Sequence, residues 1–208
     1  MRLKRKSRAG SLLELVVIVA VALGLALLIQ AFIVKPYRIP SGSMEPTLDI
    51  GQRVLVNRIG ERFSDPSVGD IVVFHPPQGA ERSECGVPGE GPFYEGPLSR
   101  RPCSRPTPQR SDQNFIKRIV AGPGDRISVR DGHAVRNGVL QKESFTRPCG
   151  GGPECNLGTI RVPPGHWFMM GDNRGQSDDS RFWGPVPTGW IIGGAFATYW
   201  PPDRIGPL

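Results

Sequence analysis

Hydrophobic positions are unevenly distributed along this chain. Residues 15–29 form one uninterrupted apolar stretch, and after Gln30 it continues to Val34. A helix rises 1.5 Å per residue, so about twenty such residues cover the roughly 30 Å of a bilayer hydrocarbon core. The pattern predicts one transmembrane helix over residues 11–34. A cleaved secretory signal is the alternative, but the stretch exceeds the roughly 7–15 apolar residues of such signals, and no small-x-small cleavage site follows before Lys35.

The rest of the chain alternates short apolar runs with turn residues. Four apolar, β-prone runs predict strands at 53–56, 70–74, 114–121 and 190–200. Between them lie three shorter runs separated by Asp-Gly and Asn-Gly turns, a hairpin signal, at 126–130, 133–136 and 139–141. We therefore expect a mainly β fold: an antiparallel β-sheet domain over residues 35–208 with a small hairpin cap over 131–165, preceded by the single transmembrane helix.

Composition supports a turn-rich protein. The chain holds 27 glycines and 22 prolines among 208 residues, about twice ordinary usage, which argues against a coiled coil or a helical bundle. Eight of the prolines and five of the glycines fall within residues 76–111. We expect this Pro/Gly-rich segment to be an irregular insertion in the domain.

Charge indicates how the chain is oriented in the membrane. The formal net charge is +7, and the first ten residues carry five cations and no acid: Arg2, Lys4, Arg5, Lys6 and Arg8. From residue 35 onward 21 basic residues face 18 acidic ones, a net charge of +3. Because cytoplasmic ends of membrane helices are enriched in Lys and Arg, residues 1–10 are expected to be a basic cytoplasmic tip, with the domain outside the cytoplasm. A basic tip without a basic domain face argues against nucleic acid as a partner.

All four cysteines follow the apolar stretch. An even number of cysteines in an exported domain predicts two disulfides among Cys85, Cys103, Cys149 and Cys155. Proximity in sequence favours Cys85–Cys103 and Cys149–Cys155 among the three possible pairings. Zinc binding is the alternative use, but the chain has no C-x-x-C pair and its three histidines are scattered. We expect neither a metal nor a cofactor.

Several common catalytic motifs are absent from the sequence. There is no G-x-S-x-G elbow, no G-x-x-x-x-G-K-[ST] phosphate loop and no H-E-x-x-H zinc motif. Two segments remain: PSGSMEPTL at 40–48, with Ser43 in a turn after the apolar stretch, and FIKRIVAGPGD at 115–125, with Lys117 among apolar neighbours. A lysine in such a strand is often a surface residue. If it is buried, a pKa lowered by about 3 units makes it a base able to activate a serine hydroxyl.

Segments in order along the chain resemble the bacterial type I signal peptidases (leader peptidases). They are PSGSMEPTL, VGDIVVFHPP at 68–77, FIKRIVAGPGD, GDNRGQSDDSRFWGPVP at 171–187 and WIIGGAFATYWP at 190–201. The resemblance implies a membrane-anchored Ser/Lys endopeptidase that removes signal peptides from exported proteins, a single-pass protein of the bacterial plasma membrane. Some members of the family also carry a short disulfide loop where Cys149 and Cys155 lie.

The same resemblance assigns roles to residues of this chain. Ser43 is implied to be the nucleophile, and neutral Lys117 the general base that takes its proton. The Ser43 N–H and the Ser41 hydroxyl are implied to hold the oxyanion. Ser177 is implied to hydrogen-bond Lys117 and to orient it.

Further residues and partners follow from the resemblance. Asp179 and Arg181 are implied to pair and to support the loop that carries Ser177. Shallow pockets for the small residues before the cut, Ala-x-Ala-like, are implied at Ile39, Pro40, Met44, Phe115 and Ile116. The implied partners are exported preproteins, the lipid bilayer and, in proximity, the secretion machinery. Contacts with lipid headgroups are expected from three aromatic residues, Phe182, Trp183 and Trp190.

Departures from the family pattern leave the substrate preference open. Gly175-Gln176 stands in place of the usual Asp-Asn, Gln52 in place of a common Asp, and Glu45 in place of an apolar or small residue. One alternative is a specialised peptidase that matures pilin or a conjugation-type substrate, and another is an inactive envelope-binding module on the same fold. A third is a cytosolic, autocleaving Ser/Lys repressor, which the apolar residues 15–34 contradict.

Overall fold

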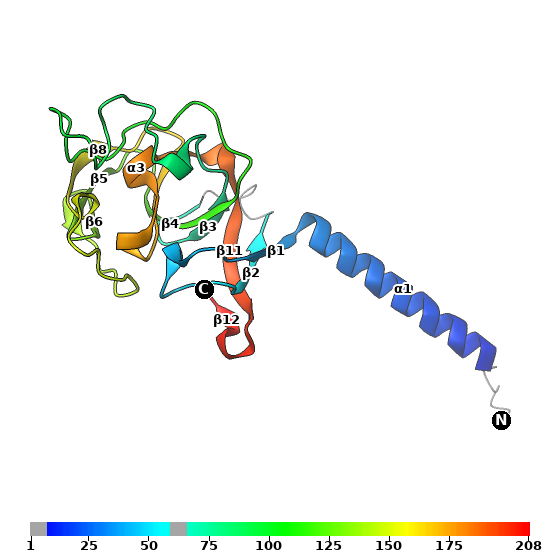
Figure 1. Cartoon of the computed structure of the whole chain (residues 1–208). Helices are drawn as coiled ribbons and strands as arrows, with labels where there is room; N and C mark the ends of the chain where they lie inside the picture. The colour runs from blue at the N-terminus through cyan, green and yellow to red at the C-terminus, as the bar shows by residue number, and fades with distance from the viewer. Residues whose placement is uncertain (1–7, 59–65) are drawn as a thin grey trace.

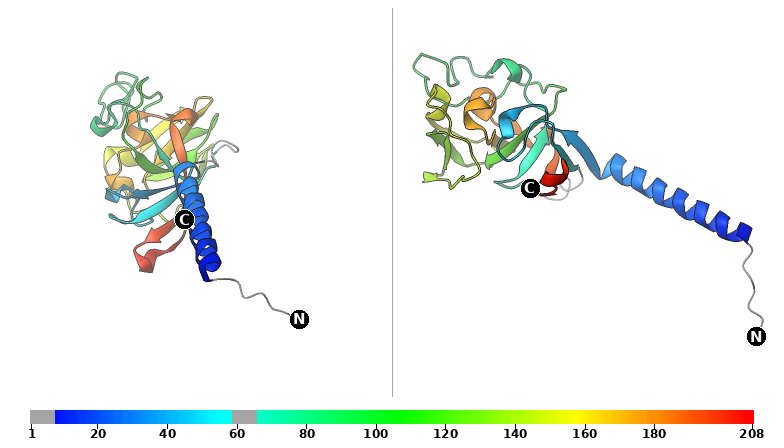
Figure 2. Two further views of the ribbon diagram at one scale, coloured as in Figure 1. Left: turned by 90° about the vertical axis from the view of Figure 1, so that its right-hand side faces the viewer. Right: turned by 60° about the horizontal axis from the view of Figure 1, so that its bottom comes forward.

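The structure is a computed structural model that describes residues 8–58 and 66–208. One long helix, α1 (Arg8–Phe32), is followed by a β domain from which the helix stands away (Figures 1 and 2). Most of the expected basic tip lies outside the described residues, namely Arg2, Lys4, Arg5 and Lys6. The tip therefore stays a prediction.

Helix α1 differs from the expected 11–34 at both ends. It begins at Arg8 and ends at Phe32, and strand β1 (Val34–Arg38) begins two residues later. Pro36 explains the earlier end, because a proline disfavours helical geometry in the residue before it and has no N–H to donate. Within the described part of the chain, no helix reaches the length and hydropathy needed to cross a membrane.

The β domain is built on a large sheet of eight strands. Its order is β1-β2-β11-β3-β4-β9-β10, with β12 paired to β11, and each pairing among these strands is antiparallel. The four longer strands predicted from the sequence are confirmed as β2, β3, β4 and β11. The bounds after β1 are β2 Arg53–Asn57, β3 Ile71–Phe74, β4 Phe115–Ala121, β9 His166–Met170, β10 Val186–Pro187, β11 Ile191–Trp200 and β12 Gly206–Pro207.

A second sheet of four strands forms the cap, at the end of the domain far from α1 (Figure 1). Its order is β7-β6-β5-β8, with bounds β5 Arg126–Arg130, β6 His133–Arg136, β7 Val139–Leu140 and β8 Leu157–Arg161. The expected start of the cap at residue 131 is wrong, because β5 pairs with both β6 and β8. Ile127 and Val129 of β5 are buried in the same cluster as Leu157 and Ile160 of β8, which makes β5 part of the cap.

The central strand β3 is buried on both faces of the large sheet. Val72 and Phe74 pack into one apolar cluster with Trp183, while Val73 packs into a second cluster with Met44. A strand covered on both faces is expected to be a continuous apolar run, as its sequence IVVF is. Elements far apart in the sequence are therefore fixed against opposite sides of one strand.

The elements predicted from the sequence pattern do not include strands β1, β8, β9, β10 and β12 or the short helix α3 (Ser180–Trp183). β1 contains Lys35 and Pro36 among five residues, so it lacks a β-prone run. With four residues, α3 is too short to show a helical period.

The headgroup contacts expected of the aromatic residues are wrong for Phe182 and Trp183. Both belong to α3 and are only 5% and 0% exposed. Trp190, the third of these residues, is half-buried.

Both predicted disulfide pairings are confirmed. Cys85–Cys103 lies in the irregular segment 76–111, with Cα atoms 5.7 Å apart, and Cys149–Cys155 closes a loop of the cap, with Cα atoms 5.8 Å apart. The Cys103 N–H donates to the Arg181 carbonyl at 3.2 Å. The insertion therefore packs on α3, beside the loop that carries Ser177.

Candidate active site

Two buried side chains from distant parts of the sequence meet at β4. Ser43 lies in the 3₁₀ turn η1 (Gly42–Met44) and is 7% exposed, and Lys117 lies on β4 and is 4% exposed. Lys117 Nζ donates a hydrogen bond to Ser43 Oγ over 2.6 Å. Met44, fully buried in the apolar core, anchors the turn against the sheet. The structure thus brings together the two residues that the sequence singles out.

Burial controls the charge of Lys117. Desolvation lowers the pKa of Lys117 from 10.5 to about 8, against the opposing effect of three carboxylates, those of Asp179, Asp178 and Asp172. The Arg181 charge adds to the lowering. At this pKa about a tenth of the lysine is neutral at pH 7, and about nine tenths at pH 9. The site therefore holds a partly neutral amine within hydrogen-bond distance of a serine hydroxyl, as a general base requires.

Ser41 and the expected pocket residues take different positions around this pair. The Ser41 hydroxyl donates to Ser43 Oγ over 3.4 Å, which is a long hydrogen bond. Pro40 is exposed, and Phe115 is half-buried against the cluster on the other face of the sheet. The remaining three lie together in one buried cluster: Ile39, Met44 and Ile116. The structure gathers three of the five and separates Phe115 from them.

Ser177 is buried next to the Ser43 turn but is not bonded as expected. It is 5% exposed, and its Oγ has no hydrogen-bond partner among the described residues, so the expected hydrogen bond to Lys117 is absent there. Gly171 accounts for the close approach, because a Cβ at this position would collide with both Ser177 Oγ and the Ser43 carbonyl oxygen. In the sequence, Gly171 is only the first residue of the segment GDNR, and nothing local indicates this contact.

The Asp179–Arg181 pair expected from the sequence is formed. Arg181 Nε and Nη2 donate to the two Asp179 oxygens, each over 2.8 Å, and both residues are fully buried. Burial alone raises the pKa of Asp179, but the charge and hydrogen bonds of Arg181 outweigh it and hold the pKa below its ordinary value. Asp179 also accepts from the Gly171 N–H at 3.0 Å, and Arg181 donates to the Ser177 carbonyl at 3.2 Å. The ionised pair therefore fixes the loop on both sides of Ser177.

Two further residues tie this loop to the serine and lysine. Asp172 is fully buried and accepts two hydrogen bonds from the Arg118 guanidinium, at 2.9 and 2.7 Å, and Arg118 directly follows Lys117. The backbone N–H of Asn173 donates to the Ser43 carbonyl at 3.1 Å, and its side-chain amide donates to the Gly42 carbonyl at 3.0 Å. The sequence does not predict either role. The only signal was their place in the segment GDNR, which shows neither burial nor partners.

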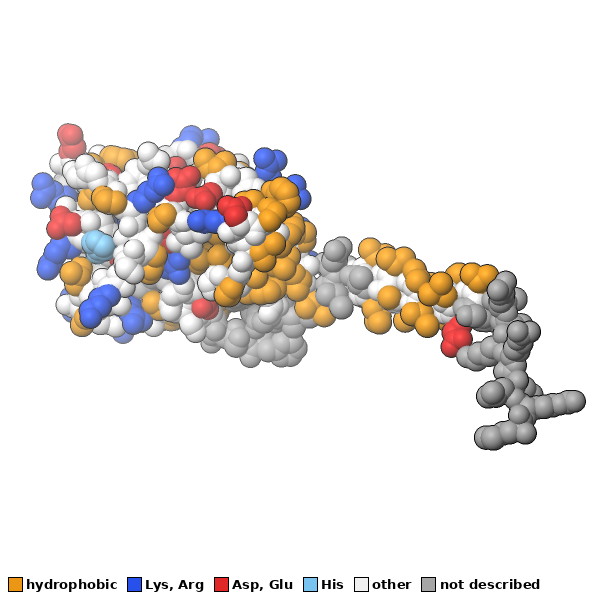
Figure 3. All heavy atoms as spheres, turned by 90° about the horizontal axis from the view of Figure 1, so that it is seen from below, with side chains coloured by type: hydrophobic (Ala, Val, Ile, Leu, Met, Phe, Trp, Pro, Cys, Tyr) orange, Lys and Arg blue, Asp and Glu red, His pale blue; other side chains and the backbone are white. Residues whose placement is uncertain are grey.

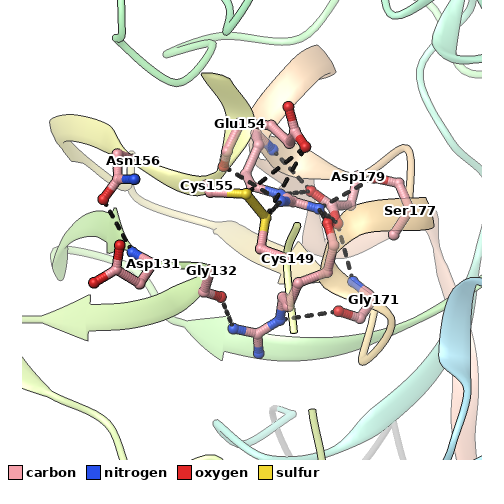
Figure 4. The surroundings of a disulfide bond; sticks show 11 residues. Asp131, Gly132, Cys149, Glu154, Cys155, Asn156, Gly171, Ser177 and Asp179 are labelled. Atoms are coloured by element: carbon pink, nitrogen blue, oxygen red, sulfur yellow. Dashed lines mark hydrogen bonds and ion pairs between the residues drawn. A yellow bond between two sulfur atoms is a disulfide. The ribbon is translucent and has the colours of Figure 1, made fainter. Parts of the chain in front are cut away.

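The Cys149–Cys155 disulfide of the cap packs against the same loop. Figure 4 shows it with Gly171 on one side and Gly132 on the other. Among the described residues, the side chains grouped closely enough to hold a metal ion are Cys149, Glu154 and Cys155. Because the two sulfurs are bonded to each other, they are not available as thiolate ligands. This group is therefore a structural contact rather than a metal centre.

Two of the departures from the family pattern have partners of their own. Gln52 is 2% exposed, and its side-chain amide donates to Thr198 Oγ1 over 2.9 Å. Glu45, beside the nucleophile turn, forms an ion pair with Arg147 at 2.9 Å. Both polar side chains are therefore satisfied, and neither leaves an unpaired charge beside Ser43.

A serine hydroxyl with a basic amine beside it, on an antiparallel sheet, fits the class of serine hydrolases that work without histidine. The family described as "Signal peptidase, peptidase S26" matches residues 12–200. The chain belongs to this family, and it is a serine endopeptidase of the signal peptidase I type.

Individual relatives agree over most of the chain. Probable signal peptidase I-1 of Synechocystis sp. is 40% identical over 196 residues, covering 94% of this chain and 86% of that protein. Thylakoidal processing peptidase 1, chloroplastic, of Arabidopsis thaliana is 37% identical over 186 residues, 88% of this chain and 47% of that protein. A crystal structure of a signal peptidase I from Enterococcus faecalis V583 is 22% identical and covers 63% of this chain and 97% of its own, with a TM-score of 0.38. The sequence relatives confirm the resemblance drawn from the motif segments.

Proposed function

We propose that this chain is a membrane-bound serine endopeptidase that removes N-terminal signal peptides from exported preproteins, with Ser43 as nucleophile and neutral Lys117 as general base. The observation that carries the proposal is the 2.6 Å hydrogen bond between Lys117 Nζ and Ser43 Oγ, made by two side chains that are both nearly inaccessible to water. Membership of the signal peptidase family supports the substrate class.

The reaction begins when Lys117 Nζ takes the proton from Ser43 Oγ, as that oxygen attacks the scissile carbonyl carbon. The Ser43 N–H and the Ser41 hydroxyl stabilise the negative charge that develops on the carbonyl oxygen. The Lys117 ammonium then gives its proton to the leaving amine, so the mature chain departs and an acyl ester remains on Ser43. A water molecule, deprotonated by neutral Lys117, hydrolyses this ester and restores the free enzyme.

Ser177 accepts a hydrogen bond from the Lys117 ammonium once the proton has moved. Its Oγ is buried and without a partner among the described residues, and an unsatisfied buried hydroxyl costs about 1–3 kcal/mol. A charged donor arriving beside it removes that cost and is stabilised in turn. The Asp179–Arg181 pair keeps the Ser177 loop in place while this happens.

The substrate binds as an extended strand beside β4. β9 pairs with β4 only from Arg118 onward, so in the described part of the chain residues 115–117 have β3 as their only strand neighbour. A peptide added at this edge finds main-chain partners and presents its scissile bond to the nucleophile. Ile39, Met44 and Ile116 lie buried in one cluster, which supports shallow pockets that accept small side chains such as that of alanine.

The enzyme acts at the outer surface of the bacterial plasma membrane, near the secretion machinery, anchored by residues 11–34 with its N-terminus in the cytoplasm. Strand β1 follows α1 almost directly, so the domain begins where the helix ends. Figure 3 shows hydrophobic side chains gathered on the part of the domain nearest the helix. The exposed apolar residues of the domain that supply lipid contacts are Ile50, Phe196, Trp200, Ile205 and Leu208.

Cleavage of a preprotein by the detergent-solubilised full chain, with N-terminal sequencing of the product, tests the proposal. We expect cleavage after a small-x-small site and loss of activity in Ser43→Ala and Lys117→Ala, both still folded. An active Lys117→Ala would overturn the assignment of the base. A folded wild type that cleaves only one dedicated substrate would favour a pilin-type maturation peptidase. One that cleaves nothing would favour an envelope-binding module.

A further inference from the structure

A second buried ion pair joins the cap to the loop behind the active site. Arg174 lies in the 3₁₀ turn η4 (Arg174–Gln176) and is 1% exposed, and Glu143, between β7 and β8, is 7% exposed. The pair is bidentate, with Arg174 Nη1 2.8 Å from Glu143 Oε2 and Nη2 2.8 Å from Oε1. His133 Nδ1 is the other titratable group at this carboxylate, 3.5 Å from Oε2. The mechanism proposed above uses none of these residues.

Each member of the pair is also bound to main chain. Glu143 Oε2 accepts a hydrogen bond from the Ala134 N–H on β6 at 2.9 Å. Arg174 Nη1 donates to the Gly132 carbonyl, and Arg174 Nε donates to the Gly171 carbonyl over 3.0 Å. One guanidinium therefore bridges the cap and the residue that follows β9.

Gly171 is the point at which this bridge reaches the active site. Its N–H donates to Asp179 and its carbonyl accepts from Arg174, so its main chain is held at both ends. Its Cα lies against Ser177 and the Ser43 carbonyl, where no side chain fits. A displacement of Gly171 would therefore disturb the Ser177 side chain and the nucleophile turn together.

We propose that Glu143 and Arg174 are positioning residues: through this ion pair the cap holds Gly171 in the place that keeps Ser43 and Lys117 at reacting distance. The inference rests on the proposed function, because it requires Ser43 and Lys117 to be the reacting groups. Charge-assisted, two-point pairing fixes a guanidinium more tightly than a single contact. Loss of the carboxylate leaves a buried arginine uncompensated, so the loop has to move to rehydrate it.

The test is the pH dependence of cleavage by Glu143→Gln, measured on the detergent-solubilised full chain. The variant keeps the side chain's size and an acceptor for Ala134, but it removes the charge opposite Arg174. We expect kcat to fall about tenfold to a hundredfold with little change in KM. We also expect the activity midpoint to move to higher pH, because a loosened loop admits water and weakens the desolvation that lowers the pKa of Lys117. The charged groups that act on Lys117 are themselves unaltered: Asp172, Asp178, Asp179 and Arg181.

A double variant separates positioning from stability. Glu143→Met combined with Arg174→Met replaces the buried ion pair by apolar side chains, a change that commonly preserves or raises stability. It also removes the donor that holds the Gly171 carbonyl. Positioning predicts a well-folded double variant with low kcat and a shifted pH midpoint, whereas a purely stabilising role predicts full activity. The matched control is Glu84→Gln, which breaks an exposed ion pair with Arg82 and should leave kcat and the midpoint unchanged.

Ser43→Ala and Lys117→Ala in the same assay keep the two proposals apart. If both are inactive while the wild type cleaves, the proposed reaction stands whatever the cap variants do. An unchanged kcat and pH midpoint in Glu143→Gln, or full activity in the double Met variant, would then overturn the positioning role alone. An active Ser43→Ala would instead remove the proposed function on which that role depends.

Discussion

Buried positive charge has two different settings in this molecule. In the loop over residues 171–181, Arg174 and Arg181 each form a bidentate pair with a buried carboxylate, from Glu143 and Asp179 respectively. On β4, Lys117 is buried to a similar degree. Within the described chain it forms no ion pair, and its hydrogen-bond partner is a serine hydroxyl.

This difference assigns the two regions to different tasks. A charge taken out of water costs several kcal/mol, and a protein offsets this cost with a counter-charge or by shifting the pKa so that the charge is lost. An arginine in a protein does not lose its proton, so only a counter-charge can offset the cost of burying it. A lysine can lose its proton, and Lys117, which has no carboxylate in contact with it, is partly neutral. The paired region is suited to holding geometry, and the unpaired lysine to moving a proton.

Replacing the unpaired lysine should cause the largest loss of activity, and it should also raise the stability of the fold. Lys117→Met removes the base, so we expect preprotein cleavage to fall by about a thousandfold or more. Lowering the pKa of Lys117 from 10.5 to about 8 corresponds to about 3 kcal/mol of destabilisation. This penalty is fully present below pH 8 and disappears as the pH rises to the unfolded value. The variant should therefore melt at a higher temperature than wild type at pH 7.

The matched measurement is thermal unfolding of wild type and Lys117→Met at pH 7 and at pH 10, in the same detergent. The gain in melting temperature should shrink at the higher pH, where the wild-type lysine is mostly neutral when folded. A variant that melts lower at pH 7 would show that the lysine contributes contacts worth more than its desolvation costs. That result would contradict the claim that the buried, unpaired Lys117 destabilises the fold.

Breaking the paired region should affect stability first. Asp179→Asn leaves Arg181 buried without a counter-charge, which is expected to lower the free energy of unfolding by about 3–5 kcal/mol in urea denaturation at pH 7. Despite its burial, Asp179 has a pKa held below the ordinary value by Arg181. Its contribution is therefore present at neutral pH and is lost as the pH falls through that depressed pKa. The difference in the free energy of unfolding between wild type and variant should therefore become smaller in strong acid.

Asp178→Asn is the control for this experiment, since Asp178 directly precedes Asp179 in the sequence and is exposed. Burial of part of its carboxyl, with the neighbouring Asp179 charge, raises the pKa of Asp178, so ionisation is slightly unfavourable in the folded state. The change should leave stability at pH 7 the same or slightly higher. If both variants lose equal stability, the pairing with Arg181 is not what holds the loop.

The same two regions differ in how well the sequence predicts their residues. Ser43 and Lys117 are predictable, because each lies in a motif segment, whereas the burial of Lys117 is known only from the structure. Glu143 is not predictable. It lies 31 residues from Arg174 in a polar stretch, and a pair between distant positions leaves no local pattern. The expected hydrogen bond from Lys117 to Ser177 is not formed between these two residues in this structure, since a resemblance transfers residues but not the distances between them.

The strands of the fold also differ in how well the sequence predicts them. β2, β3, β4 and β11 are predictable, because their propensity and their apolar pattern agree. β1 (VKPYR) and β8 (LGTIR) have weak patterns of their own and are held by pairing with β2 and β5. The apolar run of β9 (HWFMM) is a signal present in the sequence that the strand prediction leaves out. β5 is recognisable as a strand, and its pairing with β6 across the Asp131-Gly132 turn already places it in the cap.

Changing the pH gives a milder test of the unpaired lysine. We expect kcat/KM of the wild type to rise with pH and to reach half its limit near pH 8, because only neutral Lys117 accepts the serine proton. The gain from pH 7 to pH 9 should be about tenfold. The paired arginines remain charged over this range and add no titration of their own. A flat profile between pH 6 and pH 10 would contradict Lys117 as the base.

The smallest effect is expected where a pair is neither buried nor at the site of proton transfer. Glu45 lies beside the nucleophile turn and pairs with Arg147 at 2.9 Å, with side-chain exposures of 21% and 50%. Water screens such a pair, and exposed ion pairs contribute about 0.2–1 kcal/mol. Glu45→Gln should therefore lower the free energy of unfolding in urea by less than about 1 kcal/mol and leave the activity midpoint near pH 8. A shifted midpoint would mean that an exposed charge reaches Lys117 as strongly as the buried ones do. The distinction between paired and unpaired cations would then no longer explain the site.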